Sequence, residues 1–395
     1  MSWLTRACNG IPATAVIVVA LATGAIAEQP PERDEELLER MFTGDAVDVD
    51  WIAPSARRQL TPELIGSVVT RLRAAAGALQ TVEPTGDRWE LSFENGSTTV
   101  ILSRDQDGRL TGLWVNELMP HDLQVEQVVE ALAELEGETA LLVVAGDEVL
   151  GQRNPDAALL VGSAFKLAVL AAARNAVDAG TLSWDDVVRL ETERASLPTG
   201  MLQSYPDGHP LTIATLAAMM ISISDNTATD ALIELVGRDR VEAAAGIEPV
   251  LTTAEYFKLK ADGELYRRYL AAGLPERRQI LDELRPTDLP AVSMTANGRT
   301  AHGWRLPARA LCDMMASVAD LDVLTINPGN IGGPDWARVA FKGGSDVGVI
   351  NVTYWLTPVE GTPICVTATW NGDAVDEQGF ARLVTRLIHA LRTGH

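Results

Sequence analysis

The spacing of hydrophobic positions separates the chain into regions with different expected structure. After a Pro- and acid-rich start at Glu28, two short segments up to about Leu79 carry apolar residues at helical spacing. Residues 88–115 instead alternate between apolar and polar positions, interrupted by the turn pairs Asn95-Gly96 and Asp107-Gly108. This alternation predicts a three-stranded antiparallel meander. Residues 28–122 are therefore interpreted as a small α+β domain.

The pattern changes again at about residue 123. A helical segment is followed by two strand-like runs, a long helical middle, more strand-like runs from about residue 337, and an amphipathic helix from Glu377. Strands near both ends of the region are expected to meet in one sheet. The helical middle is expected to form an all-helical subdomain with a cleft between the two, which gives a second domain over residues 123–395.

The first 27 residues read as a secretory signal peptide. Arg6 precedes an apolar stretch from about Ile11 to Leu21, and the small residues Ala25 and Ala27 follow it. We expect cleavage near Ala27 and a secreted or periplasmic protein without a stable membrane span after cleavage. An uncleaved anchor is the alternative, although the apolar run is short for a spanning helix.

Composition restricts the possible partners. The formal net charge of -22 argues against binding to nucleic acid, which requires clustered Lys and Arg side chains. The five histidines show no metal-ligand spacing, so no metal and no other cofactor is predicted. After signal cleavage Cys312 and Cys365 remain, and sequence alone leaves open whether they form a disulfide. The oligomeric state also stays open.

A serine and a lysine three residues apart begin the apolar run "GSAFKLAVLAAA". This spacing places Ser163 and Lys166 on one face of a helix, close enough to interact. A serine hydroxyl needs a neighbouring base to act as a nucleophile, and burial lowers the pKa of a lysine so that it can serve as that base. The alternative interpretation is an ordinary helix start with a solvated lysine.

Lysine usage favours the reactive interpretation. The chain has four lysines, Lys166, Lys258, Lys260 and Lys342, against 28 arginines (32 minus 4). A lysine in an apolar setting, where nearly every other cation is arginine, indicates a role that requires losing a proton. A compositional drift from Lys to Arg explains the scarcity of lysine but not the position of Lys166.

Two further segments carry candidate site residues. Ser224, Asp225 and Asn226 interrupt an apolar helical run, where a helix N-cap would need only one of the three polar groups. In the later segment Lys342-Gly343-Gly344-Ser345, paired glycines inside a strand indicate close approach of a ligand or another backbone. A plain β-bulge is the alternative for these glycines.

Taken in order, Ser163-x-x-Lys166, Ser224-Asp225-Asn226 and Lys342-Gly343-Gly344 resemble the three motifs of class A β-lactamases and penicillin-binding proteins. The resemblance covers about residue 123 to the C-terminus and implies a β-lactamase-like fold, with an antiparallel sheet flanked by helices and an all-helical subdomain. The preceding α+β domain resembles nuclear-transport-factor-2 and steroid-isomerase folds in element order alone. The combination also resembles two-domain serine hydrolases associated with clavulanic acid biosynthesis.

The resemblance implies a role for each matching residue. Ser163 would be the acylated nucleophile, Lys166 its base, and Ser224 the group that passes a proton to the leaving nitrogen. Asn226 would contact the substrate amide, and Lys342 would act electrostatically on Ser224 and the substrate carboxylate. The backbone N–H groups of Ser163 and Ser345 would form the oxyanion hole, Gly343 and Gly344 would belong to the substrate-binding strand, and Asp225 would be structural.

The chain departs from the family pattern at two places. Gly343 stands where the family usually has Thr or Ser, which removes a hydroxyl that would bind a substrate carboxylate. The E-x-x-L-N loop whose Glu activates the deacylating water in class A enzymes is also absent. Glu255 and Glu264 are the nearest acids, but both lie in helix-like contexts that do not favour them as bases.

The sequence therefore predicts a secreted serine hydrolase with β-lactamase-type activity on a small β-lactam, ester or peptide-like substrate. A DD-peptidase or penicillin-binding protein, or an esterase, is the alternative within enzymes. A catalytically silent binding protein of the cell envelope is the alternative from another class.

Overall fold

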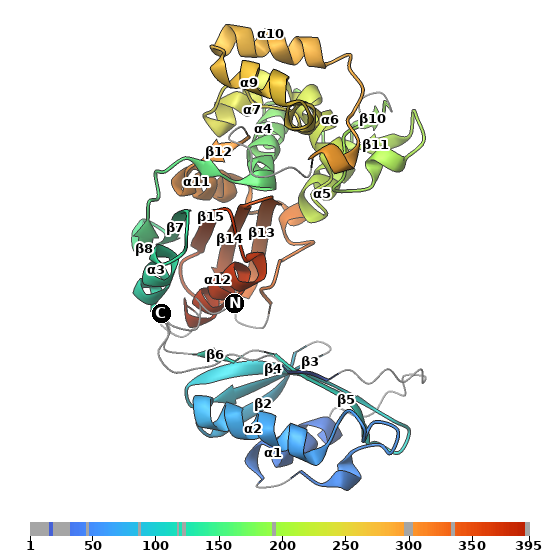
Figure 1. Ribbon diagram of the computed structural model, residues 1–395, viewed down its shortest axis with the longest axis vertical. Coiled ribbons are helices and arrows are strands. Elements are labelled where there is room, and N and C mark those ends of the chain that lie inside the picture. The colour runs from blue at the N-terminus through green and yellow to red at the C-terminus, as the bar shows by residue number, and fades with distance from the viewer. Residues whose placement is uncertain are drawn as a thin grey trace. The chain divides into compact units, whose positions relative to one another are not determined.

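The computed structural model describes residues 16–18, 32–44, 47–85, 88–116, 118–120, 124–191, 195–295, 303–332 and 336–391. They form two compact units, each with its own hydrophobic core (Figure 1). The first unit comprises the described residues up to Gln127 together with 385–391, and the second comprises Val128–Val384. Apart from 16–18, the predicted signal peptide lies outside the described residues.

The first unit is an antiparallel sheet covered by helices. The strands lie in the order β1 (Val16–Val18), β5 (Leu110–Val115), β4 (Gly96–Arg104), β3 (Arg88–Phe93) and β2 (Leu79–Thr85), and β6 (Met119–Pro120) also pairs with β4. The helices are α1 (Glu32–Thr43) and α2 (Pro62–Ala76), with a short 3-10 turn η1 (Val49–Trp51) between them. Strands β3 to β5 form the predicted meander, and β2 adds a strand that the sequence pattern did not predict.

The core of this unit forms where the helices cover the sheet. Leu38, Met41 and Phe42 of α1 are almost completely buried, as is Phe93 of β3. The rings of Phe42 and Phe93 meet edge to face with centroids 6.0 Å apart. Helix α2 begins at the N-cap Thr61, whose hydroxyl accepts a hydrogen bond from the Leu64 N–H.

The second unit is built on a five-stranded antiparallel sheet. Its order is β13 (Trp336–Asp346), β14 (Val349–Pro358), β15 (Ile364–Asn371), β7 (Glu138–Ala145) and β8 (Glu148–Arg153). Strands from the two ends of the region therefore pair, β15 with β7, as the sequence pattern predicted. A two-stranded pair of β9 (Leu159–Leu160) and β12 (Arg305–Leu306) and another of β10 (Val187–Arg189) and β11 (Pro210–Thr212) complete the strands.

Helices cover both faces of this sheet. Because side chains alternate along β15, Cys365 faces α11 (Ala308–Val318), whereas Trp370 faces α12 (Glu377–Leu391), where its ring lies 6.1 Å from that of Phe380. Helix α3 (Val125–Ala133) precedes the sheet, and η2 (Gly162–Phe165) leads into α4.

The helical middle lies beyond one end of the sheet in Figure 1. It comprises α4 (Lys166–Asp178), α5 (Ile213–Ser222), α6 (Asn226–Val236), α7 (Arg238–Ala245), α8 (Thr253–Ala261), α9 (Gly263–Ala271) and α10 (Leu274–Leu284), with the short turns η4 (Leu202–Ser204), η5 (Val292–Thr295) and η6 (Asp322–Leu324). Helix α4 is its centre, since its residues from Lys166 to Ala173 are all buried.

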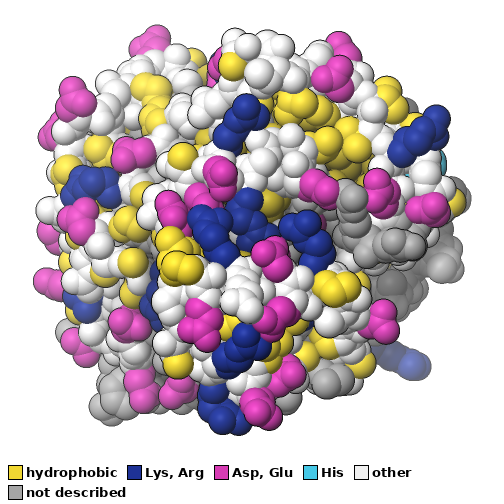
Figure 2. Space-filling model, turned by 90° about the horizontal axis from the view of Figure 1, so that it is seen from above, with side chains coloured by type: hydrophobic (Ala, Val, Ile, Leu, Met, Phe, Trp, Pro, Cys, Tyr) yellow, Lys and Arg dark blue, Asp and Glu magenta, His cyan; other side chains and the backbone are white. Residues whose placement is uncertain are grey.

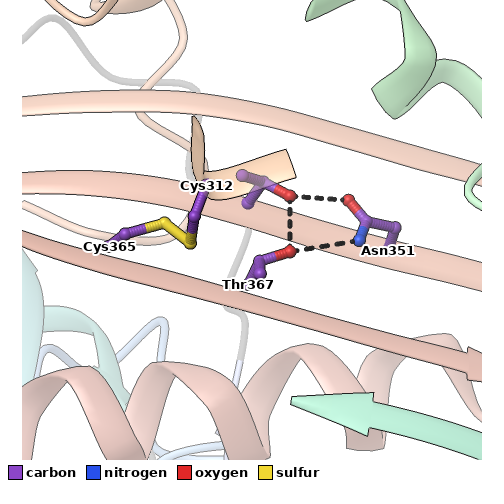
Figure 3. The surroundings of a disulfide bond; sticks show 5 residues. Cys312, Asn351, Cys365 and Thr367 are labelled. Carbon is purple, nitrogen blue, oxygen red and sulfur yellow. Dashed lines mark hydrogen bonds between the residues drawn. A yellow bond between two sulfur atoms is a disulfide. The ribbon is translucent and has the colours of Figure 1, made fainter. Parts of the chain in front are cut away.

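A disulfide joins α11 to the sheet, which answers the question that the sequence left open. Cys312 and Cys365 are bonded, with Cα atoms 5.9 Å apart (Figure 3). Beside the bond, Asn351, Thr353 and Thr367 form a buried hydrogen-bonded group between β14 and β15. The Thr353 and Thr367 hydroxyls are 2.8 Å apart, so these buried polar side chains satisfy one another.

Figure 2 looks onto the end of the second unit that carries α9 and α10, where Lys and Arg side chains gather among acids. Arg268 pairs with Glu283 at 2.8 Å, and Arg278 pairs with Glu242 at 2.6 Å. Within the described ranges, every helix is too short or too polar to cross a membrane.

Candidate active site

Ser163 lies in η2, at the point where the chain turns into α4. Gly162 begins this turn with a φ of +50°, a conformation that glycine adopts without steric cost. A side chain at Gly162 would also meet the backbone nitrogen of Ser345, 2.9 Å from the position of its Cβ. The turn leaves Ser163 half-buried at the edge of the helical middle.

Lys166 is completely buried and does not point to solvent, which excludes the interpretation as an ordinary helix start. Its Nζ lies 2.6 Å from the Ser224 carbonyl oxygen, 2.8 Å from Asn226 Oδ1 and 3.1 Å from Ser224 Oγ. Burial, and secondarily the nearby Lys342 cation, holds the pKa of Lys166 well below its usual range.

Lys166 donates to all three of these oxygens, which match the three N–H groups of a lysine ammonium. Burial favours the loss of one of these protons, which would free the lone pair that a base needs. The sequence predicted the contact between the first and second motifs only loosely. It did not indicate that the Ser224 carbonyl and the Asn226 amide would be the partners of Lys166.

Ser224 occupies a tight turn between α5 and α6. Its φ of +57° is left-handed, which is uncommon for a residue other than glycine. The turn is held by Asp225, whose carboxylate accepts hydrogen bonds from the backbone N–H groups of Ala228, Met201 and Leu202. Asp225 is therefore the N-cap of α6 and a structural anchor, and Ser224 is left to present its hydroxyl.

Lys342 reaches the same hydroxyl from β13. Its Nζ donates to Ser224 Oγ at 3.2 Å and to the Gly343 carbonyl oxygen at 2.5 Å. Burial lowers the pKa of Lys342 to about 7. Its cross-strand neighbour on β14 is Thr353, a neutral residue that does not offset this burial. Ser224 Oγ thus lies between two lysines whose cationic forms are both disfavoured.

Gly344 is the position where the sheet meets the nucleophile turn. A Cβ at Gly344 would lie 2.1 Å from the Val161 carbonyl oxygen and 2.6 Å from the Ser163 nitrogen. The β13–β14 register is continuous here, which excludes a bulge. Close backbone approach is thus the reason for glycine, and it brings Ser345 next to the turn that carries Ser163.

Gly343 has a different environment. A Cβ at this position would meet the end of the Phe341 ring at 2.9 Å, and that ring packs against Tyr354 with centroids 4.5 Å apart. The aromatic pair occupies the space that a Thr or Ser side chain would need. This packing accounts for the first departure from the expected motif.

A pocket of about 210 Å³ opens beside Ser163. It is lined by Ser163, Asn226 and Ser345 of the predicted site. Its other walls include Thr253, Tyr256, Trp304 and Asp346, which sequence reasoning missed. The scarcity of lysine was the one sequence signal that pointed toward these residues, because one of the four lysines, Lys260, contacts Asp346.

Residues 124–246 match the sequence profile described as the Beta-lactamase enzyme family. This match includes the first two motifs, and the structure brings the third motif to the same hydroxyl. Over this segment, which is less than half of the chain, the sequence is similar to the β-lactamase enzyme family. The match supports the β-lactamase-like fold and the serine hydrolase class that the motifs implied.

Solved structures with similar folds include two β-lactamases. One from Sphaerobacter thermophilus DSM 20745 is 22% identical and has a TM-score of 0.49, with 68% of this chain and 95% of that chain covered. One from Chitinophaga pinensis DSM 2588 is 18% identical with a TM-score of 0.48, covering 67% and 98%. A structure of PBP-A is 17% identical with a TM-score of 0.47, covering 68% and 93%. No curated protein sequence matches the chain significantly.

The two acids nearest the missing β-lactamase loop are used elsewhere. Glu255 completes the capping box of α8 and pairs with Arg238 at 2.6 Å. Glu264 lies in the first turn of α9 and is exposed. Neither side chain lines the pocket. Among the described residues that line the pocket, Asp346 is the one that carries a carboxylate.

Proposed function

We propose that this protein forms an acyl-enzyme on Ser163 with β-lactams or related activated carbonyl compounds and hydrolyses it slowly. The observation that carries the proposal is the placement of Ser224 Oγ between Lys166 and Lys342, at 3.1 and 3.2 Å, next to the pocket that holds Ser163. A hydroxyl between two low-pKa amines is suited to passing protons.

Acylation would begin with Lys166 in its neutral form. Lys166 accepts the proton of the Ser163 hydroxyl, and Ser163 Oγ attacks the substrate carbonyl carbon. The resulting oxyanion is stabilised by the backbone N–H groups of Ser163 and Ser345. The low pKa of Lys166 supports this role, because an ordinary lysine would be protonated and unable to accept a proton at neutral pH.

The leaving group would then receive a proton through Ser224. Its hydroxyl donates to the departing nitrogen or oxygen, and Lys166 or Lys342 replaces that proton. The carbonyl–leaving group bond breaks and the acyl ester on Ser163 remains. The short contacts from both lysines to Ser224 Oγ support this transfer.

Slow turnover is proposed because, among the described residues, the nearby carboxylates are already engaged and none is placed to activate water for attack on the acyl ester. Glu255 is held by Arg238 and the cap of α8, and the Asp346 carboxylate is bound by other side chains. The acyl group is therefore expected to persist for longer than in a class A enzyme that has the E-x-x-L-N loop.

The test is intact-mass spectrometry after mixing with a fluorescent penicillin. We expect a single adduct on wild-type protein, located at Ser163 by peptide mapping and lost over time, and no adduct on Ser163→Ala. Rapid loss would favour an efficient β-lactamase, and permanent labelling would favour a penicillin-binding protein.

Failure to label, combined with ester cleavage that requires Ser163, would favour an esterase. Equal inactivity of wild type and Ser163→Ala on β-lactams, activated esters and D-Ala-D-Ala peptides would refute the enzyme proposal and favour a silent binding protein.

We also propose that the protein acts outside the cytoplasm. The signal-like first 27 residues and the disulfide between Cys312 and Cys365 support export, because such bonds persist in oxidising compartments. Amino-terminal sequencing of the protein recovered from the medium or periplasm would test this. Recovery only from the cytoplasm with Met1 intact would contradict it.

A further inference from the structure

A charged cluster closes one side of the pocket. Asp346, the last residue of β13, accepts hydrogen bonds from Lys260 Nζ at 2.6 and 2.7 Å and from the Tyr256 hydroxyl. Tyr256 and Lys260 are one turn apart on α8. The cluster Asp346–Tyr256–Lys260, called the clamp below, therefore joins β13 to α8 at the wall of the pocket.

The two charges of the clamp, on Asp346 and Lys260, pair with each other. Asp346 Oδ1 accepts from Lys260 and from the Val347 N–H at 2.7 Å, and Oδ2 accepts from Lys260 and Tyr256. With about four lone-pair sites on a carboxylate, this set leaves no site open for a water molecule. The Lys260 side chain is only 1% exposed, so it faces Asp346 instead of a ligand.

The rest of this wall is aromatic. Trp304 stacks on Phe165 with ring centroids 3.8 Å apart, and Tyr256 lies 4.9 Å from Trp304. Phe165 belongs to the Ser163-x-x-Lys166 motif itself, so the stack runs from the nucleophile turn to the clamp. The volume of about 210 Å³ is below that of pockets that enclose a whole drug-sized molecule. It suits one apolar group of a substrate.

The position of the pocket indicates which group that is. Ser163 and Ser345 line it, whereas Ser224 and Lys342, which serve the leaving group in the proposed function, are not among its lining residues. The leaving group is thus directed toward Ser224, and the acyl side chain is the part that remains for the pocket.

We infer that the mutual neutralisation of Asp346 and Lys260 in the clamp keeps this enzyme selective for substrates with an uncharged, apolar or aromatic acyl side chain. This inference rests on the proposed acyl-enzyme. Because Asp346 and Lys260 neutralise each other, an anionic or cationic acyl group would lose its hydration without gaining a partner. Removing one partner leaves the other charge uncompensated, so each single variant is expected to change selectivity in the opposite direction.

The experiment uses 4-nitrophenyl esters of phenylacetic acid, 4-carboxyphenylacetic acid and 4-(aminomethyl)phenylacetic acid, which differ mainly in charge. We expect the full-length wild-type protein to prefer the neutral ester in kcat/KM over both charged esters. In Asp346→Asn the ratio of anionic to cationic ester is expected to rise about tenfold, and in Lys260→Gln to fall about tenfold.

Two further variants serve as controls. Lys258→Gln removes a lysine from the same helix whose Nζ donates to the Leu284 carbonyl oxygen at 2.9 Å, and we expect it to keep the wild-type ratios. The double variant Asp346→Asn/Lys260→Gln is neutral again and is expected to restore the neutral preference. If the single variants fail to fold, the double variant decides, since a changed preference there would overturn the inference.

The outcomes separate the two proposals. An absence of acyl adduct on wild-type Ser163 with all three esters would refute the proposed function. Adduct formation in the wild type, together with charge ratios that stay the same in both single variants, would overturn only the role of the clamp.

Discussion

Gly344→Ala is the most direct test of how the sheet positions the nucleophile. The added Cβ would lie 2.1 Å from the Val161 carbonyl oxygen, 2.5 Å from the Ala164 nitrogen and 2.6 Å from the Ser163 nitrogen. Cβ contacts below 3.0 Å are essentially never observed. All three neighbours are backbone atoms, so no side-chain rotation relieves the clash.

The strand and the turn must therefore separate by at least 0.9 Å (3.0 minus 2.1). That displacement acts on the two N–H groups proposed for the oxyanion hole. Misplacement of reacting groups by 1 Å costs about 100-fold in rate, and loss of one oxyanion donor costs about 100- to 1000-fold. We expect acylation of Ser163 to slow by about 100-fold or more.

The assay is the rate of adduct formation with a fluorescent penicillin, followed by intact mass in single-turnover conditions. Gly343→Ala is the matched comparison, because the one atom that its Cβ would meet closer than 3.0 Å is a side-chain atom at the end of the Phe341 ring, and not backbone. We expect its loss to be at least tenfold smaller than that of Gly344→Ala. Acylation of folded Gly344→Ala at the wild-type rate would refute the assignment of Ser345 and Ser163 to the oxyanion hole.

Three further outcomes are expected. Lys342→Met removes a like charge that lowers the pKa of Lys166, so the pKa of Lys166 is expected to rise. The effect applies below about pH 7, where Lys342 is charged in the wild type. In a plot of acylation rate against pH, the rise in rate is therefore expected to occur at higher pH than in the wild type. A rise that stays in place or moves to lower pH would contradict this coupling. Removing the disulfide with Cys312→Ala/Cys365→Ala opens a 53-residue loop and is expected to lower the free energy of unfolding by about 4 kcal/mol, measured by denaturant titration. A loss below about 1 kcal/mol would mean that α11 is already fixed by packing. Asp225→Ala leaves three backbone N–H groups without their acceptor and is expected to cost about 3 kcal/mol or more, with Asp225→Asn costing less because it keeps one acceptor oxygen. Equal stability of the two variants would show that the carboxylate is not the anchor of this turn.

Local patterns predicted most of the helices and strands, because the hydrophobic repeat of each element spans only a few residues and can be read within a short segment. The alternation in residues 88–115 was sufficient for the meander, and the motif order was sufficient to place Ser224 and Lys342 near Lys166. Strand β2 was missed because its residues Leu79–Thr85 expose most side chains and lack a clear alternation. The resemblance of the first unit to nuclear-transport-factor-2 folds stays a prediction, since the family match begins at residue 124.

The pocket walls could not be predicted for a different reason. Tyr256, Trp304 and Asp346 come from three separate segments, and only Asp346 adjoins a motif that the sequence singled out. Their contacts depend on the distance between α8 and the end of β13, which no local pattern encodes. The partners of Lys166 were hidden in the same way, because a carbonyl oxygen such as that of Ser224 leaves no trace in a sequence.

The left-handed backbone of Ser224 bears on how the protein could evolve. That conformation costs an L-residue roughly 1–2 kcal/mol, and a glycine at position 224 would avoid the cost. Selection for thermal stability alone would thus favour replacing the residue that lies between both lysines. A stabilised laboratory lineage that acquires Ser224→Gly would gain melting temperature and lose acylation together. If Ser224 is kept when the same selection also requires turnover, the stability difference between the serine and glycine variants measures the stability that the protein loses for catalysis.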